Sequence, residues 1–542
     1  MSRVSGAVTL LALALCAALG MTLLPAAATA EPSLRAVPAV EPPAVPVIAW
    51  GQCEDVDDID GNPSRMQCAT VAVPLDYDDP TGPTVDLDLL RIPASDPSRR
   101  IGSLFVNPGG PGGSSRWFAA YFGHLVPDEL SRRFDVIGVD PRGVGPSAPA
   151  VCRNPDRHPP YPRVAFPTTP RQVRRQIAFD RWERRACRDG AAPIVDHMST
   201  ADTARDMDVL RQAVGDDQLT YYGVSYGAQL GATYAAMFPD HVRAMILDGV
   251  LDPVEWSTGD GGDGGQPFSE RIDSGHGAWR TLTSALNECN RVGPKRCPIA
   301  GHAHRIWRDV VQRLHRRPFE HLSYADLVYF SLGALYRPDG IRMLMRQLKA
   351  LHAAIFDGDS RGRPGGWLAR ARGSRDRGVL PGPYAPGSSV ADASARAIVN
   401  TFASVACADT DNPADPHTWV RAARRADRRS PWYGAAWTWV SSICAGWPAR
   451  TKADRFTGPY DVATSAPVLV VGNTFDPATP ISGARAVHRL LAGSRLLELH
   501  AFGHGAIGSG PCIGRAYASY LARGVLPAPG TVCDPRKPLF PA

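Results

Sequence analysis

Residues 219–238 read LTYYGVSYGAQLGATYAAMF, and the centre of this stretch is the pentapeptide Gly223-Val224-Ser225-Tyr226-Gly227. The segment LTYY before it favours a strand, and the small residues after it favour a helix that Pro239 ends. A G-x-S-x-G sequence between a strand and a helix is typical of a nucleophile elbow, in which a strained turn exposes the serine hydroxyl. Short motifs also match by chance in a glycine-rich chain, so the flanking strand and helix decide the interpretation. We predict Ser225 to be a catalytic nucleophile.

A glycine-rich loop supports this prediction. Residues 107–114 read NPGGPGGS and follow the apolar segment SLFV at 103–106, which we predict to be a strand. In hydrolases with a nucleophile elbow, such a loop supplies one backbone N–H of the oxyanion hole, and the residue after the nucleophile supplies the other. We predict Gly110 and Tyr226 as the two donors, with Gly109 as the alternative to Gly110. The loop lacks the Lys-Ser/Thr of a P-loop and the spacing of a dinucleotide site.

The acid and the base are expected late in the chain. Asp476 follows the predicted strand PVLVV at 467–471, and His504 lies in Gly503-His504-Gly505, beyond the predicted strand RLLEL at 495–499. His500 is the alternative base, but its place at the strand end predicts a packing role. The order Ser, Asp, His is the one found in α/β-hydrolases. In this interpretation His504 takes the proton of Ser225, and Asp476 orients the imidazole.

The chain alternates strands and helices on both sides of this motif. Further strands are predicted at 84–92, 135–139 and 244–247, and a helix at 201–214 with Thr200 as its cap. This alternation predicts a doubly wound, mostly parallel sheet, the α/β-hydrolase fold. The sheet signal stops near Pro253 and returns after about residue 455. We therefore predict a first core part at 51–253, a mainly helical cap insertion at 254–455 and a C-terminal core part at 456–542.

The N-terminus and the cysteines predict export. Arg3 precedes an apolar run at 8–24, and Ala28-Thr29-Ala30 resembles a cleavage site, so residues 1–30 are predicted to be a signal peptide and 31–50 a Pro-rich linker. The alternative is an uncleaved anchor; after cleavage we expect no stable membrane insertion. Ten cysteines follow Cys16 in sequential near pairs, and five local disulfides are the simplest connectivity in an exported chain. We expect a secreted protein, possibly one that stays at the cell wall.

Charge and spacing argue against other classes of function. The net charge is +6 without a block of like charge, so we expect no nucleic-acid partner. His302 and His304 lack a third ligand at a diagnostic spacing, and the Gly259–Gly265 loop, with Asp260 and Asp263, lacks the length of a calcium loop. We therefore expect neither a metal nor a cofactor.

Several motifs together resemble the secreted tripeptidyl aminopeptidases of Gram-positive bacteria, within the prolyl-aminopeptidase-related serine peptidases. Besides the elbow and the NPGGPGGS loop, these motifs are CATV at 68–71 with VPLDY at 73–77, DPRGVGPS at 140–147, CAD at 407–409, CAGWP at 444–448, DPATP at 476–480, GHG at 503–505 and the pair Cys512 and Cys533. The resemblance covers most of the chain beyond residue 50.

The resemblance implies removal of short peptides, often tripeptides, from substrates with a free N-terminus. Such an exopeptidase needs an anion for the substrate ammonium, and Asp409, Asp252 and Glu255 are the candidates; a lid salt bridge for Asp409, and turn or loop positions for the other two, are the alternatives. A carboxylesterase or lipase with the same triad remains the second hypothesis, because the core alone does not determine the substrate. The third is a non-catalytic wall-binding protein on the same scaffold.

Overall fold

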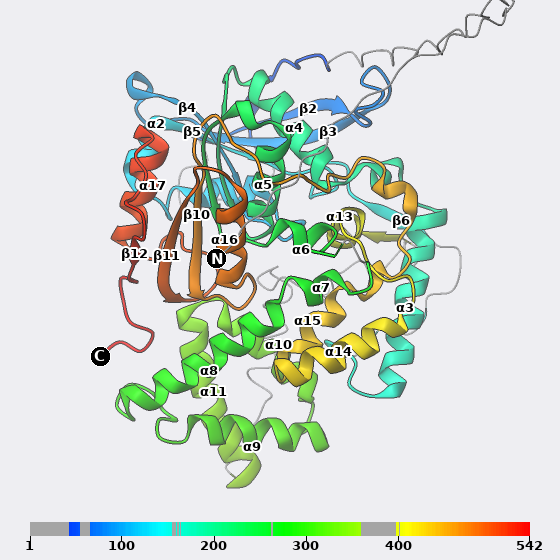
Figure 1. The fold of residues 1–542 in the computed structure, drawn as a ribbon, viewed down its shortest axis with the longest axis vertical. Helices are drawn as coiled ribbons and strands as arrows, with labels where there is room; N and C mark the ends of the chain where they lie inside the picture. The colour runs from blue at the N-terminus through cyan, green and yellow to red at the C-terminus, as the bar shows by residue number, and fades with distance from the viewer. Residues whose placement is uncertain are drawn as a thin grey trace, which may run out of the picture. The chain divides into compact units, whose positions relative to one another are not determined.

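A ten-stranded sheet in the order β1-β2-β3-β5-β4-β7-β8-β10-β11-β12 forms the centre of the fold (Figure 1). The strands are β1 (Gly51–Gln52), β2 (Gln67–Pro74), β3 (Thr84–Ile92), β4 (Gly102–Asn107), β5 (Phe134–Val139), β7 (Leu219–Val224), β8 (Val242–Asp248), β10 (Leu469–Phe475), β11 (Arg495–Phe502) and β12 (Val532–Cys533). The pairs from β1 to β5 are antiparallel, and those from β5 to β12 are parallel. The predicted mostly parallel sheet is confirmed.

The computed structural model describes residues 43–54, 65–153, 159, 162, 164–261, 264–358, 397–399 and 401–542. The predicted signal peptide, residues 31–42 of the predicted linker and Asp263 lie outside the described residues.

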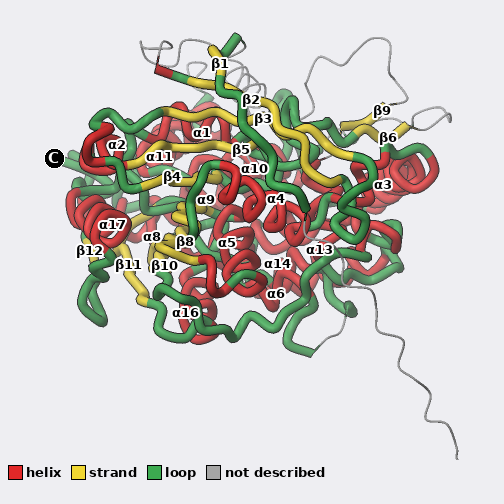
Figure 2. Tube along the Cα trace, turned by 90° about the horizontal axis from the view of Figure 1, so that it is seen from above, coloured by secondary structure: helices red, strands yellow, loops and turns green. Residues whose placement is uncertain are grey.

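Helices cover both faces of the sheet, as a doubly wound fold requires. One face packs against α4 (Thr200–Ala213), α5 (Tyr226–Met237) and α16 (Ile481–Leu490). The other packs against α1 (Ser115–Phe122), α2 (Asp128–Arg133) and α17 (Pro511–Arg523). All six residues of β4 are buried, whereas β3 begins with alternating exposed and buried residues. The central parallel strand β4 is therefore buried throughout, whereas the antiparallel strand β3 alternates at its start. Figure 2 shows the strands from above as neighbouring yellow ribbons.

The segment between β8 and β10 is mainly helical, as predicted. Its helices are α6 (Pro253–Ser257), α7 (Phe268–Arg271), α8 (Ser274–Val292), α9 (Ala303–Arg316), α10 (Tyr324–Leu335), α11 (Pro338–Phe356), α13 (Thr401–Asp409), α14 (His417–Arg429) and α15 (Tyr433–Thr438). Most of them share a separate hydrophobic core that includes Trp307, Leu344 and Trp419. In Figure 1 they lie below the sheet, at the end to which β10 leads.

One part of the first core segment joins the insertion. Strand β6 (Val151–Arg153) pairs with β9 (Ala397–Val399) in a two-stranded antiparallel sheet, and the helix α3 (Pro170–Asp189) packs against the turn at Trp439–Cys444. No pattern in the sequence had indicated either contact.

Several element boundaries differ from the prediction, among them those of β8, which begins at Val242 and ends at Asp248, and of β11, which ends at Phe502. Ser199, not Thr200, caps α4: its side chain accepts the N–H of Asp202, whose carboxylate accepts the N–H of Ser199. Thr200 instead bonds Asp409 from the insertion. Strand β10 begins at Leu469 rather than Pro467, because proline has no N–H for the ladder.

The ten cysteines after Cys16 form five disulfides, in the predicted sequential connectivity. The pairs are Cys53–Cys68, Cys152–Cys187, Cys289–Cys297, Cys407–Cys444 and Cys512–Cys533. Within the described part of the chain, the helices are all too short or too polar to cross a membrane.

Candidate active site

Ser225 stands at the sharp turn between β7 and α5. Its backbone has φ 63° and ψ −127°, a conformation that is strained for a residue other than glycine. The flanking glycines are required by close approach: a Cβ on Gly223 would lie 2.2 Å from the carbonyl oxygen of Gly227, and one on Gly227 would lie 2.5 Å from that of Asn107. The N–H of Ser225 donates to the carbonyl of Asp248 at 2.9 Å. The turn therefore has the geometry of a nucleophile elbow.

Asp476 and His504 form a buried pair at the C-terminal ends of β10 and β11. The Nδ1 atom of His504 lies 2.9 Å from Oδ2 and 3.0 Å from Oδ1 of Asp476, which is 1% exposed. Oδ1 also accepts the N–H groups of Ala478 and Thr479, both at 2.8 Å. Burial acts to lower the pKa of His504, but the carboxylate of Asp476 outweighs it, so the pKa is raised above 6.5. The imidazole is thus held with Nδ1–H toward the acid, which leaves Nε2 to accept a proton.

Two residues that the sequence did not single out also contact His504. The hydroxyl of Thr479 lies 3.2 Å from Nδ1. Tyr336, at the end of α10, packs edge-on against the imidazole with ring centres 5.1 Å apart, and its carbonyl accepts the N–H of His504 at 2.9 Å. The insertion therefore helps to fix the imidazole. The spacing of Thr479 from Asp476 in the DPATP motif is a local signal, whereas nothing in the sequence relates Tyr336 to His504.

His500, the alternative base, has a different environment. It lies within β11 with 60% of its side chain exposed, and its Nδ1 atom is 4.0 Å from Asp534. Most of its side chain is exposed, and its ring lies 6.0 Å from that of Phe475, so His500 packs against a neighbour on one side only.

The glycine loop after β4 lies against the start of α5. A Cβ on Gly109 would be 2.7 Å from the backbone nitrogen of Tyr226, so the loop and the elbow are in direct backbone contact. The N–H of Gly109 is already bound to the side chain of Asn107 at 2.8 Å. The N–H groups of Gly110 and Tyr226 donate to no acceptor in the part of the chain that the structure describes. These two N–H groups, unlike that of Gly109, are therefore free to bind another acceptor.

The structure gives Asp409 partners within the protein. It is 4% exposed; Thr200 bonds both carboxylate oxygens, and the indole N–H of Trp256 donates to Oδ2 at 3.2 Å. Thr200 also bonds the hydroxyl of Tyr226. Burial raises the pKa of Asp409 to about 6. Through Thr200, Asp409 supports the side chain of Tyr226, which follows Ser225 in the chain. The bonds from Thr200 and Trp256 occupy both oxygens of Asp409.

Asp252 and Glu255 lie on the segment that follows β8 and passes beside His504. A Cβ on Gly249 would be 3.3 Å from Cε1 of His504, and Asp252 then caps α6 by accepting the N–H groups of Val254 and Glu255. One residue after Glu255, the ring of Trp256 packs against that of Tyr226. Helix α6 therefore borders the elbow.

The carboxylate of Glu255 is partly exposed and surrounded by negative charge. Burial, then Asp260 and Asp252, raise its pKa to about 7, and Arg271 is the nearby cation, with Nε 3.9 Å from Oε2. Arg271 acts on Glu255 and Arg489 acts on Asp252, so three carboxylates face two guanidiniums and the local charge remains negative.

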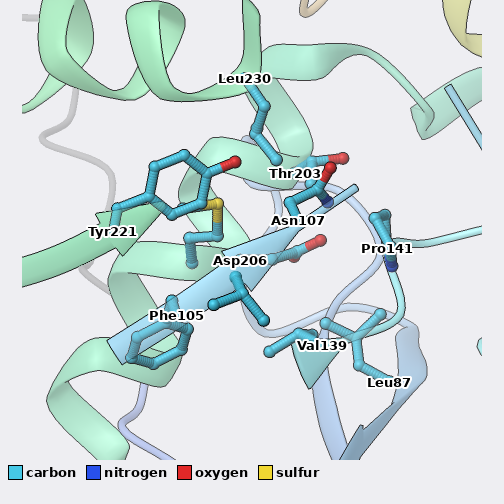
Figure 3. Close-up of a pocket in the computed structure, with 11 residues that line it drawn as sticks. Leu87, Phe105, Asn107, Val139, Pro141, Thr203, Asp206, Tyr221 and Leu230 are labelled. Carbon is cyan, nitrogen blue, oxygen red and sulfur yellow. The ribbon is translucent and has the colours of Figure 1, made fainter. Parts of the chain in front are cut away.

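The cavity drawn in Figure 3 is separate from these residues. It has a volume of about 20 Å³, enough for one water, and lies between the sheet and α4, lined among others by Phe105, Asn107 and Tyr221. A larger groove of about 550 Å³ is lined by Phe475, Phe502, residues of α8 and the C-terminal segment. Neither is lined by Ser225 or His504.

One group of side chains has a spacing that could hold a metal, within the residues that the structure describes. It consists of Asp76, His197 and Asp454, whose ligand atoms lie within 4.8 Å of one another. Nδ1 of His197 is 3.3 Å from Oδ2 of Asp454, and Asp76 accepts the N–H of Asp78. The group shows this one close contact between His197 and Asp454, and we infer no metal site from it.

Comparison with known proteins gives these features a context. Residues 102–268 match the family described as alpha/beta hydrolase fold, and residues 430–533 match the family described as TAP-like protein. The chain is 32% identical to a tripeptidyl aminopeptidase of Streptomyces lividans over 504 residues, which cover 90% of this chain and 87% of that protein. It is 33% identical to carboxylesterase B of Mycobacterium tuberculosis over 529 residues, 94% of each chain. It is 30% identical to serine protease Hip1 of the same organism over 517 residues, 90% of this chain and 91% of that protein.

Proposed function

The chain belongs to the tripeptidyl aminopeptidase family of α/β-hydrolases and is a serine hydrolase, and from that premise we propose that it releases short peptides, tripeptides above all, from free N-termini. The observation that carries the proposal is the buried Asp476–His504 pair at the same end of the parallel sheet as the strained turn of Ser225. In this proposal these three residues are the catalytic triad, and the N–H groups of Gly110 and Tyr226 form the oxyanion hole.

The reaction proceeds through an acyl-enzyme. Nε2 of His504 takes the hydroxyl proton of Ser225 as the oxygen attacks the carbonyl carbon of the scissile amide. The two N–H groups stabilise the negative oxygen that forms. The C–N bond then breaks, the leaving amine takes the proton from His504, and the N-terminal peptide remains as an ester on Ser225. The same imidazole deprotonates a water molecule, which hydrolyses this ester.

An exopeptidase must also bind the substrate ammonium. The geometry favours the acids of α6 over Asp409, because both oxygens of Asp409 are already bound by Thr200 and Trp256. Glu255 has the exposure and the surplus of negative charge that an ammonium requires, with Asp252 beside it. An ammonium would stabilise ionised Glu255, so substrate binding would release protons near neutral pH.

We also propose that the protein is exported. The five disulfides support this, since such bonds persist in oxidising surroundings. Exposure to free peptides outside the cell fits an exopeptidase that needs no cofactor.

A carboxylesterase is the second candidate, and the similarity to carboxylesterase B is the observation in its favour. The triad and the oxyanion hole serve both reactions equally, so the ammonium site decides between them.

The test compares peptides that carry free or acetylated N-termini, with mass spectrometry of the products, and p-nitrophenyl esters in the same preparation. The proposal predicts fragments of three residues from the free peptides only. Rapid ester turnover without peptide cleavage would favour the carboxylesterase hypothesis over the exopeptidase. Equal cleavage of free and acetylated peptides would exclude a site for the substrate ammonium.

A further inference from the structure

Asp248, the last residue of β8, is a fully buried carboxylate for which the mechanism above has no use. It is 0% exposed. Four groups donate to it: the hydroxyls of Tyr222 and Tyr517 at 2.7 and 2.8 Å, and the N–H groups of Ala506 and Ile507 at 2.9 and 3.2 Å. A buried carboxylate with that many donors is held in one orientation, because moving it would leave several polar groups unpaired.

The hydrogen bonds of Asp248 connect the turn that carries Ser225 with the loop that follows His504. Its carbonyl accepts the N–H of Ser225, whereas its carboxylate accepts the N–H groups two and three residues after His504. The next residue of the chain, Gly249, has φ +58°, and a Cβ there would lie 3.3 Å from Cε1 of His504. The backbone thus passes directly beside the imidazole.

We propose that Asp248 is a positioning residue for His504: its carboxylate fixes the histidine loop to the nucleophile elbow, and its negative charge stabilises the imidazolium that forms during the reaction. This inference rests on the proposed triad and adds to it a second acid on a different strand. Asp476 orients the imidazole through Nδ1, while Asp248 acts through the backbone beyond it and through its charge.

The charges around His504 make this effect measurable. The groups that face the imidazole are Asp476 on the loop after β10, Asp248 at the end of β8 and the neutral Tyr336 of the insertion. Burial raises the pKa of Asp248, and its four donors act in the opposite direction by stabilising the ionised form. Both carboxylates raise the pKa of His504 against the effect of its burial.

The experiment is the pH dependence of kcat/KM for Asp248→Asn. We expect kcat to fall by about 10- to 100-fold with KM nearly unchanged, as for a group that acts in the transition state. We also expect the acid limb, which reports the pKa of His504 in the free enzyme, to move to lower pH by about half a unit or more. A merely structural role predicts lower stability and an unmoved limb, and that result would overturn the proposal.

A second variant covers the case in which Asp248→Asn does not fold. Tyr222→Phe with Tyr517→Phe keeps the carboxylate but removes two of the four donors that hold it in one orientation. The positioning role then predicts a fall in kcat that is smaller than for Asp248→Asn, with KM nearly unchanged, and an unchanged kcat would count against the proposal. Tyr234→Phe is the matched control, because the hydroxyl of Tyr234 donates to a different buried carboxylate, Asp208, at 2.8 Å; its kcat should stay within a few-fold of the original.

Fluorophosphonate labelling separates this inference from the function on which it rests. If Ser225 of the unmodified protein does not react, the proposed triad is wrong. If Ser225 reacts and the limb of Asp248→Asn stays in place, only the role of Asp248 is wrong.

Discussion

Replacing Asp476 by asparagine has a consequence that follows atom by atom from the structure. Oδ1 accepts the N–H groups of Ala478 and Thr479 and lies 3.0 Å from Nδ1 of His504, whereas Oδ2 lies 2.9 Å from Nδ1 and accepts the N–H of Gly505 at 3.4 Å. An asparagine carbonyl can keep the first two bonds, so its NH₂ group must take the place of Oδ2. That NH₂ group then faces two other donors, Nδ1–H of His504 and the N–H of Gly505.

His504 resolves this conflict by moving its proton from Nδ1 to Nε2, after which Nδ1 accepts from the NH₂ group. Nε2 is the atom that must take the proton of Ser225, so the base is lost although the geometry is kept. The corresponding change in the serine protease triad costs about 10⁴-fold in kcat. We expect Asp476→Asn to lose about 10³- to 10⁴-fold, which is about 4–5.4 kcal/mol of transition-state stabilisation.

The assay is kcat at neutral pH with the best peptide or ester substrate, together with thermal unfolding. Asp135→Asn is the control, since Asp135 is a buried carboxylate that bonds Ala94 and Arg100 outside the site; it should affect stability and leave kcat within a few-fold. A folded Asp476→Asn variant within about tenfold of the original kcat would refute the reasoning.

Three further predictions concern pH, substrate binding and stability. Because Asp476 raises the pKa of His504 above 6.5 and only the neutral imidazole acts as a base, kcat/KM should fall about tenfold per unit as pH drops below that pKa; a profile that stays flat to about pH 5 would contradict this. Glu255→Gln should raise KM about tenfold for peptides with a free N-terminus and leave KM for neutral p-nitrophenyl esters unchanged. Glu288→Gln is the control, because Glu288 is an acid paired with Arg291 on α8. Equal effects of the two variants would exclude an ammonium site at Glu255. Replacing both Cys152 and Cys187 by serine opens a link across 35 residues and should lower the free energy of unfolding by about 3–4 kcal/mol in denaturant titration, with an unchanged midpoint as the contrary result.

The sequence predicted the residues whose roles depend on local geometry. A serine in a strand–turn–helix segment, and an aspartate and a histidine just after apolar strands, are recognisable from a few neighbours because parallel strands bring their C-terminal ends to one edge of the sheet. The disulfide connectivity could be predicted because each cysteine pairs with its neighbour in the order of the chain, at separations from 8 to 37 residues.

The sequence did not indicate the residues whose roles depend on distant contacts. Asp248 was visible only as the end of an apolar strand, and its function arises because Tyr517 and Ala506 approach it from more than 250 positions away. Tyr336 reaches His504 only because the insertion folds back over the sheet. Asp409 was one of three candidate acids for the substrate ammonium, but its oxygens are bound by Thr200 of α4 and Trp256 of α6, which are far from it in the sequence.

Mapping the site of fluorophosphonate labelling tests the central claim most directly. The protein is treated with the probe, digested and sequenced by tandem mass spectrometry, beside Ser225→Ala and Ser114→Ala; Ser114 lies in the glycine loop and caps α1. We predict one adduct, on Ser225, which is absent from Ser225→Ala together with all turnover and present in Ser114→Ala. An adduct on another serine, or turnover that survives Ser225→Ala, would contradict the account.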